Sequence, residues 1–183
     1  MSAPAGPRAV LDFWFHELVP EAWWKTDPML DLQIRDRFIA LWKQAAAGEL
    51  AWWRADARGR LAEVIVLDQF SRNLHRDSGQ AFAQDPMALV LAQEAVAGGA
   101  LAALDADERN FLLMPAMHSE SAAIHAWGEP LFRAHAPEKN HAFELRHKAI
   151  IDRFGRYPHR NAVLGRVSTP EELEFLQQPG SSF

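Results

Sequence analysis

The sequence has no cysteine and only one tyrosine among its 183 residues. Without a thiol, the protein can form no disulfide framework, thiolate zinc site, iron–sulfur cluster or cysteine nucleophile. No apolar run approaches the roughly 20 residues that a membrane-spanning helix needs. The first residues also lack the basic start and the apolar core of a signal peptide. We therefore expect a soluble cytoplasmic protein with no membrane partner.

The composition is that of a folded, mildly acidic protein. Hydrophobic residues make up 49% of the chain and charged residues 23%, and the net charge is −5 with histidine neutral. The apolar share is too high for a disordered chain, and the mild acidity argues against a general nucleic-acid binder. The length fits one domain over residues 1–183. Residues 1–8 and 179–183 are expected to be loose termini.

The apolar residues recur with the period of an α-helix. Asp27 and Pro28 have the residue types of a helix start, and apolar residues then follow at helical spacing up to Gly48, at Leu30, Ile34, Phe38, Leu41 and Trp42. Asp85 and Pro86 repeat this start signal further along the chain. Hairpin turns of the Asn-Gly or Asp-Gly type are absent, so strands are not favoured.

The remaining segments fit an all-α fold of about eight helices. Asp105 with Glu108, and Thr169 with Glu172, have the spacing of capping boxes. Pro115 is expected to kink or break the helix that follows Asp105. The other predicted helices cover residues 9–18, 60–74, 85–97, 141–154 and 169–178.

The first candidate block of polar residues directly follows the apolar run Val64 to Leu67. Asp68 and Arg72 are four residues apart, so they share a helical face and can form an ion pair. Because Asn73 and its neighbours extend a buried helix, some of them must be partly buried and need partners. This block is compatible with a structural ion pair and with a ligand-binding role.

The second block contains His118 and Glu120. His118 is a candidate general base, with Glu120 or Asp68 as the carboxylate that orients it. A hydrogen-bonded core histidine is the alternative for His118 and for His125, seven residues later. No His-Glu-x-x-His motif is present, so we predict no metal site and no cofactor.

The third block is rich in arginine. It contains Arg153, Arg156, His159, Arg160 and Asn161 around a Gly/Pro loop. The window from residue 139 to 166 has seven basic and two acidic residues, a net charge of +5, so the rest of the chain carries −10. Guanidinium groups suit carboxylate or phosphate, which predicts a small-anion site. The alternative is that these arginines pair internally with acidic residues.

Tryptophan is concentrated in the first third of the chain, and two doublets stand out. Trp23-Trp24 and Trp52-Trp53 lie 29 residues apart. Most of these rings are expected in the core, but a doublet cannot bury both rings toward one side. One ring of each doublet is a candidate to line a groove.

With these motifs together, the chain resembles the bacterial domain-of-unknown-function family numbered 924. The matching stretches occur in order over almost the whole chain, at residues 10–15, 23–24, 34–38, 67–73, 81–86, 111–120 and 153–176. Ser71 departs from the pattern, where proline is more usual. The resemblance implies stacked antiparallel helix pairs in a short tetratricopeptide-like superhelix, and it implies no activity.

Three functions are compatible with these residues. The first is binding of a small anionic ligand or an acidic peptide end by Arg72, Arg153, Arg156 and Arg160, with His118 and His159 as additional donors. The second is a hydrolase that uses His118 as its base. The third is a scaffold in which the polar blocks pair with one another and no pocket remains. The oligomeric state is not predicted.

Overall fold

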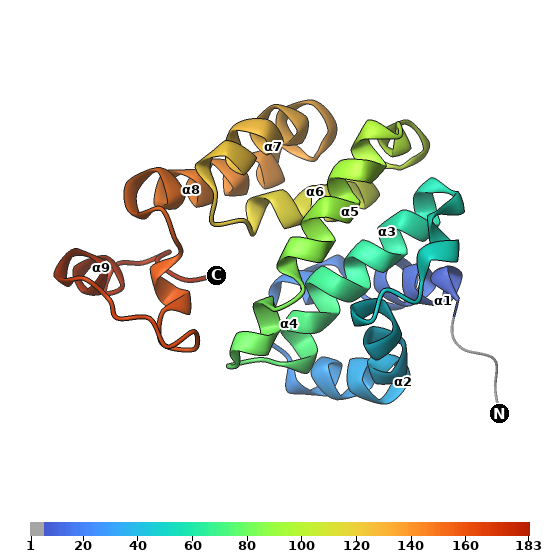
Figure 1. Cartoon of the computed structure of the whole chain (residues 1–183), viewed down its shortest axis with the longest axis horizontal. Helices are drawn as coiled ribbons and strands as arrows, with labels where there is room; N and C mark the ends of the chain where they lie inside the picture. Colours follow the sequence, from blue (N-terminus) through green and yellow to red (C-terminus); the bar gives the residue numbers. More distant parts are fainter. Residues whose placement is uncertain (1–5) are drawn as a thin grey trace.

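The computed structural model describes residues 6–183, and these residues form helices and loops without any strand, which confirms the all-α prediction (Figure 1). The α-helices are α1 (Pro7–Asp12), α2 (Pro28–Ala46), α3 (Ala57–Ile65), α4 (Ser71–Leu74), α5 (Asp85–Ala97), α6 (Ala106–Met117), α7 (Ala122–His135), α8 (Glu138–Phe154) and α9 (Pro170–Phe175). Within residues 6–183, no helix combines the length and apolar character required to cross a lipid bilayer.

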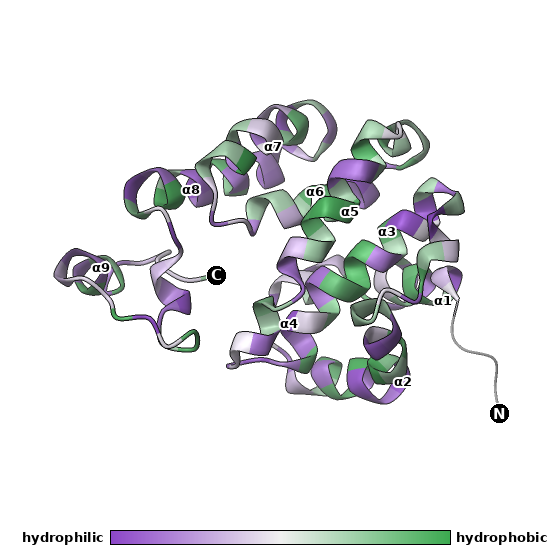
Figure 2. Ribbon diagram, in the orientation of Figure 1, coloured by the Kyte–Doolittle hydropathy of each residue, from purple (hydrophilic) through white to green (hydrophobic). Residues whose placement is uncertain are grey.

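Helix α2 forms for the reasons that its sequence indicates. The Asp27 side chain accepts a hydrogen bond from the backbone N–H of Met29 at 2.8 Å and so caps the helix. The residues of the apolar stripe are buried at Leu30, Ile34, Phe38 and Leu41. Figure 2 shows both hydrophobic and hydrophilic colour around α2, as expected for an amphipathic helix on the outside of a core.

Residues 57–74 form a nearly continuous helix with an irregular turn in its middle. The predicted helix over residues 60–74 is divided between α3 and α4, and Val66–Phe70 between them is a π-helical turn. Every residue of that turn is buried, including Asp68 and Gln69. A π-turn widens the helix by one residue per turn and is often found at functional sites. Here it places two polar side chains inside the protein.

Of the kink or break expected at Pro115, the break does not occur. Helix α6 continues past it to Met117, and His118 is the C-cap. A proline so close to the end of a helix removes one backbone hydrogen bond but leaves little helix beyond it to disrupt. Both predicted capping boxes are present, at Asp105 with Glu108 and at Thr169 with Glu172.

The core is an aromatic and aliphatic cluster enclosed by the N-terminal helices. Trp14 packs edge-to-face on Phe70 and on Phe111, with centroids 5.7 and 5.5 Å away, and Phe38 lies 5.0 Å from Phe70. Edge-to-face pairs add specificity to the burial of large rings. Helix α3 packs against α1, α5 and α6 around this cluster.

In the C-terminal part of the chain, α7 packs against both α6 and α8. Gly155, with φ of 69°, ends α8 and turns the chain toward α9. Residues 1–5 of the expected loose N-terminus lie outside the described part, and Pro7 already starts α1. At the other end, Phe183 lies 3.7 Å from His147 of α8 between ring centroids, so the last residue contacts α8. The tetratricopeptide-like superhelix stays a prediction.

Gly59 tests the close packing at the start of α3. A Cβ added there would lie 1.8 Å from the backbone carbonyl oxygen of Trp53, an impossible contact unless the chain moves. We expect Gly59→Ala to lower the free energy of unfolding by about 3 kcal/mol, measured by urea denaturation. Gly6→Ala is the control, because Gly6 has φ of −84° and no atom within 4 Å of such a Cβ. Equal stability of the two variants would contradict this account.

Candidate functional site

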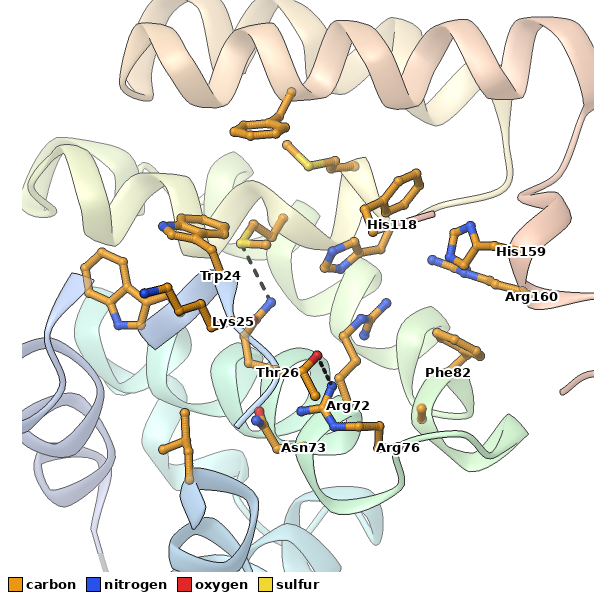
Figure 3. A pocket seen from close by; sticks show the side chains of 18 of the residues that line it. Trp24, Lys25, Thr26, Arg72, Asn73, Arg76, Phe82, His118, His159 and Arg160 are labelled. Carbon is orange, nitrogen blue, oxygen red and sulfur yellow. Dashed lines mark hydrogen bonds between the residues drawn. The ribbon is translucent and has the colours of Figure 1, made fainter. Parts of the chain in front are cut away.

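A cavity of about 500 Å³ lies between the N-terminal helices and the C-terminal segment. Its wall comes from the chain around Trp24, from α4 and the loop after it, from the end of α6, and from α8 with the loop that follows (Figure 3). This volume is in the range of small-molecule sites, which are mostly apolar with a few convergent polar groups.

Some of the predicted site residues meet in this cavity and others do not. Arg72, Asn73, His118, His159 and Arg160 line it. Figure 3 shows His159 and Arg160 reaching from the C-terminal segment toward Arg72 and His118. The structure thus brings together residues from the first, second and third polar blocks of the sequence.

Arg153 and Arg156 lie outside the cavity, so the predicted clamp of four arginines is not assembled. Arg153 pairs with Glu171 at 2.9 Å, and Arg156 forms a two-pronged pair with Glu172 at 2.7 and 2.8 Å. Both acids are in the first turn of α9. The alternative of internal ion pairs therefore describes these two arginines.

Asn161 joins the same C-terminal ion-pair cluster. Its Nδ2 donates to Ser168 at 3.0 Å and to Glu172 at 3.2 Å, and its Oδ1 accepts from Arg166 at 2.9 Å. It is buried and holds the loop between α8 and α9, so its amide does not face the cavity.

Glu120 does not orient His118. It forms a two-pronged pair with Arg166, at 2.7 and 2.9 Å, and accepts the backbone N–H of Tyr157 at 2.7 Å. Its carboxylate therefore ties the C-terminal loop to the end of α6 and leaves Asp68 as the orienting carboxylate for His118.

His125 is a core histidine with all of its hydrogen-bonding capacity used. Its Nδ1 lies 2.6 Å from Glu144, and its Nε2 lies 2.9 Å from the carbonyl oxygen of Ser119 and 3.1 Å from the hydroxyl of Tyr157. His125 and Glu144 are fully buried and do not line the cavity. This pair is part of the packing between α7 and α8.

Arg72 is held by two carboxylates at the floor of the cavity. Its guanidinium donates to both oxygens of Asp85 at 2.9 and 3.0 Å, and one nitrogen also lies 3.3 Å from Asp68. Asp85 was expected to cap α5, but Gln84 is the N-cap and makes no side-chain cap. The carboxylate of Asp85 serves as the partner of Arg72 instead.

Arg160 has almost no polar partner, although it is only 5% exposed. Its guanidinium stacks on Phe82 and Tyr157, at 4.4 and 4.6 Å from their centroids. The nearest carboxylate oxygen, on Asp85, is 3.6 Å away. Within residues 6–183 the guanidinium donates no hydrogen bond, and its Nε is buried without a partner. Burial and the nearby Arg72 charge lower the pKa of Arg160.

Asp68 and His118 form a buried hydrogen-bonded pair. The Nδ1 of His118 lies 2.8 Å from Asp68 Oδ1, and Gln69 donates to the other carboxylate oxygen at 2.6 Å. Burial raises the pKa of Asp68, but its interactions with His118 and Arg72 outweigh it and leave the pKa below its usual value. Burial and the Arg72 charge lower the pKa of His118, so its imidazole is neutral at neutral pH.

Two further histidines of the cavity are also held neutral. Burial lowers the pKa of His147 to about 3 and that of His159 to about 4. The Nδ1 of His147 donates to the carbonyl oxygen of Phe143 at 2.7 Å, whereas the Nδ1 of His159 is buried without a partner. The cavity therefore has several neutral imidazoles beside the guanidinium groups of Arg72, Arg76 and Arg160.

Aromatic side chains form part of the remaining cavity wall. Both rings of the first doublet, Trp23 and Trp24, line it together with Phe143 and Phe183. The second doublet lies elsewhere, with Trp53 buried and Trp52 exposed. Figure 3 shows Trp24 on the opposite side of the cavity from Arg160. The cavity thus has a tryptophan-lined end, where Lys25 also lies, and a cationic end at Arg72 and Arg160.

Several cavity residues have no direct signal in the sequence. Phe82 lies between two predicted helices and His147 lies within one, and only the fold shows that Phe82 stacks on Arg160 and His147 on Phe183. Asp85 was noticed, but for a capping role. Within residues 6–183, no cluster of three or more His, Asp or Glu side chains is arranged to hold a metal ion.

Comparison with known proteins identifies a matching protein family and a similar solved structure. The family model described as a bacterial protein of unknown function (DUF924) matches residues 10–180. A solved structure of the protein of unknown function ATU0120 from Agrobacterium tumefaciens is similar, with a TM-score of 0.89 and 34% identity over 93% of this chain and 96% of that one. No curated protein matches the sequence.

The ion-pair cluster around Glu172 predicts an acid-sensitive part of the stability. Hydrogen bonds from Arg156, with that from the Thr169 N–H, lower the pKa of Glu172 to about 2. The stabilisation is therefore complete above the unfolded-state pKa of about 4.3 and is lost as the pH falls toward 2. We expect Glu172→Gln to cost about 2 kcal/mol of unfolding free energy at pH 7 and little at pH 2.

Urea denaturation at several pH values measures this effect, and Glu171→Gln is the matched control. Glu171 is the adjacent carboxylate, but its ion pair with Arg153 is largely exposed. Such pairs contribute little, so this control should follow the parent at every pH. A loss at pH 7 that persists unchanged at pH 2 would show that the Glu172 charge is not responsible.

Proposed function

The chain belongs to the bacterial protein family of unknown function DUF924, and because that family brings no activity with it, we propose a function from the cavity: it binds a small molecule that carries a carboxylate or phosphate group. The negative group would lie at the cationic end, against Arg160. The apolar part of the ligand would lie against the tryptophan doublet.

The buried guanidinium of Arg160 is the observation that carries this proposal. A charged group out of water is costly unless it is paired and hydrogen-bonded. Arg160 stacks between two rings, which leaves the edge of the guanidinium plane as its polar surface, and none of the described residues accepts a hydrogen bond from it. An anionic ligand oxygen would supply the missing acceptor with the geometry that guanidinium prefers.

The charges of the groups around Arg160 also support the binding of an anionic ligand. Arg72 and Arg160 share Asp85, and Asp68 is taken up by Arg72 and His118. The charges of the two carboxylates and the two guanidinium groups cancel, but only Arg72 makes hydrogen bonds to a carboxylate. A ligand carboxylate beside Arg160 would therefore bind without displacing an existing hydrogen bond.

The size of the cavity favours a small molecule over a scaffold role. A pure scaffold predicts that the polar blocks pair off and leave no pocket. Arg153 and Arg156 do pair off, but Arg160 does not, and about 500 Å³ stays open beside it. That volume and the aromatic wall suit a ligand with one anionic group and one apolar or aromatic body.

Ligand-dependent thermal stability tests the proposal. We expect phenylacetate and phenyl phosphate to raise the melting temperature of the parent, since a ligand at 100 times its Kd adds about 2.7 kcal/mol of stability. Arg160→Met keeps an apolar side chain between the two rings but removes the charge, so its shift should be lost. Titration calorimetry then gives the affinities.

Arg153→Met is the matched control, because Arg153 is in the same basic segment but pairs with Glu171 outside the cavity. It should respond to both compounds as the parent does. The proposal fails if neither compound binds the parent, or if Arg160→Met binds them as tightly as the control does.

A further inference from the structure

We propose that this cavity is an active site in which His118, oriented by Asp68, is the general base for hydrolysis of a carboxylate-bearing ester. The inference rests on the proposed anion binding and goes beyond it, because it assigns a reaction to the bound molecule. It is carried by the geometry of the dyad and by its position in the cavity wall.

The Asp68–His118 hydrogen bond fixes the tautomer of the imidazole. An ionised carboxylate only accepts hydrogen bonds, so Nδ1 must carry the proton that it donates to Asp68 over 2.8 Å. The lone pair is then on Nε2. Within residues 6–183, the His118 side chain makes no other hydrogen bond, and His118 lines the cavity (Figure 3). A neutral imidazole with a free basic nitrogen at a ligand pocket has the requirements of a general base.

Asp68 is held rigidly enough to serve as a positioning residue. It lies in the π-helical turn Val66–Phe70, with Gln69 donating to one carboxylate oxygen and Arg72 close to the other. The carboxylate is sealed from solvent and does not line the cavity itself. It can therefore orient His118 but cannot reach a substrate, which separates the roles of the two residues.

Water is the nucleophile that fits this site. The sequence has no cysteine, and within the described residues no serine, threonine or tyrosine hydroxyl is hydrogen-bonded to His118. The cavity hydroxyl of Thr26 interacts with Arg76 instead, at 3.4 Å. The proton that Nε2 takes up would thus come from a bound water molecule.

The reaction follows from these positions. Nε2 of His118 takes a proton from water, and the water oxygen forms a bond to the ester carbonyl carbon while the carbonyl electron pair moves onto its oxygen. That oxyanion develops in the field of Arg72, whose charge also acts on His118. The C–O bond to the alcohol then breaks, and the alkoxide takes the proton back from His118. Ester and water give acid and alcohol.

The two ends of the cavity define the substrate class. Arg160 would hold a carboxylate on the acyl part of the ester, and the wall of Trp23, Trp24 and Phe143 would hold an aromatic or apolar alcohol part. Mono-4-nitrophenyl succinate combines these features, with a free carboxylate, one ester bond and an aromatic alcohol. Release of 4-nitrophenolate reports the turnover directly.

The decisive variant is His118→Gln, which keeps a similar shape but has no base. We expect the parent to hydrolyse the probe above the buffer rate and the variant to lose about 100-fold or more of that rate. Asp68→Asn should also lose activity, because an amide can donate to Nδ1 and reverse the tautomer. His141→Gln is the control, since His141 pairs with Glu129 outside the cavity and should leave the rate unchanged.

The pH profile of the parent provides a test that does not depend on a variant folding. The groups that act on His118 are Asp68, Arg72 and Asp85, and His147 and His159 lie near it as neutral rings. Because the pKa of His118 is lowered from about 6.5, the rate should be flat at neutral pH and fall only in more acidic solution.

The outcomes separate catalysis from binding. If phenylacetate binds but the parent does not hydrolyse the probe, or if His118→Gln hydrolyses it at the parent's rate, the catalytic inference is overturned and the binding function stands. A rate that keeps falling as pH drops from 9 through neutrality would also overturn it. If no anion binds, both proposals fail together.

Discussion

The interaction on which the site depends is the sharing of Arg72 between Asp68 and Asp85. Asp68 is in the π-turn after α3, Arg72 is in α4, and Asp85 starts α5. The guanidinium therefore joins three consecutive segments at the floor of the cavity. Burying the charge of Arg72 is costly without such partners. The irregular turn supplies Asp68, and Asp85 serves as a partner of Arg72 instead of as a cap.

The ion pairs of Arg72 with Asp68 and Asp85 also determine the charge states and the pairing of the groups around them. With Arg72 adjacent, Asp68 stays ionised although it is buried, and His118 stays neutral although it faces a carboxylate. Asp85, already engaged by two hydrogen bonds from Arg72, is left 3.6 Å from Arg160. One well-formed ion pair thus produces both a neutral base and an under-partnered cation in the wall of one cavity.

Local signals in the sequence were sufficient to predict the helices and part of the site. Caps at Asp27, Asp105 and Thr169 depend on neighbours within three residues, and the structure confirms them. The i, i+4 spacing of Asp68 and Arg72 likewise indicated their contact. The pairing of Asp68 with His118 spans 50 residues, so the sequence could only name both as candidates. Periodicity carries no information about such distant partners.

The basic window over residues 139–166 shows why a prediction from charge alone was wrong for part of the site. Its net charge of +5 pointed to the right loop, but Arg153, Arg156 and Arg166 are neutralised by acids of α9 and by Glu120. Two of those acids, Glu171 and Glu172, were visible in the sequence at the start of the last predicted helix, where Glu172 combines its capping-box role with its ion pair. Arg160 differs because Phe82 and Tyr157 enclose its faces and keep carboxylates at a distance. A cluster of arginines therefore marks a region, and the aromatic packing around one of them decides which cation remains available for a ligand.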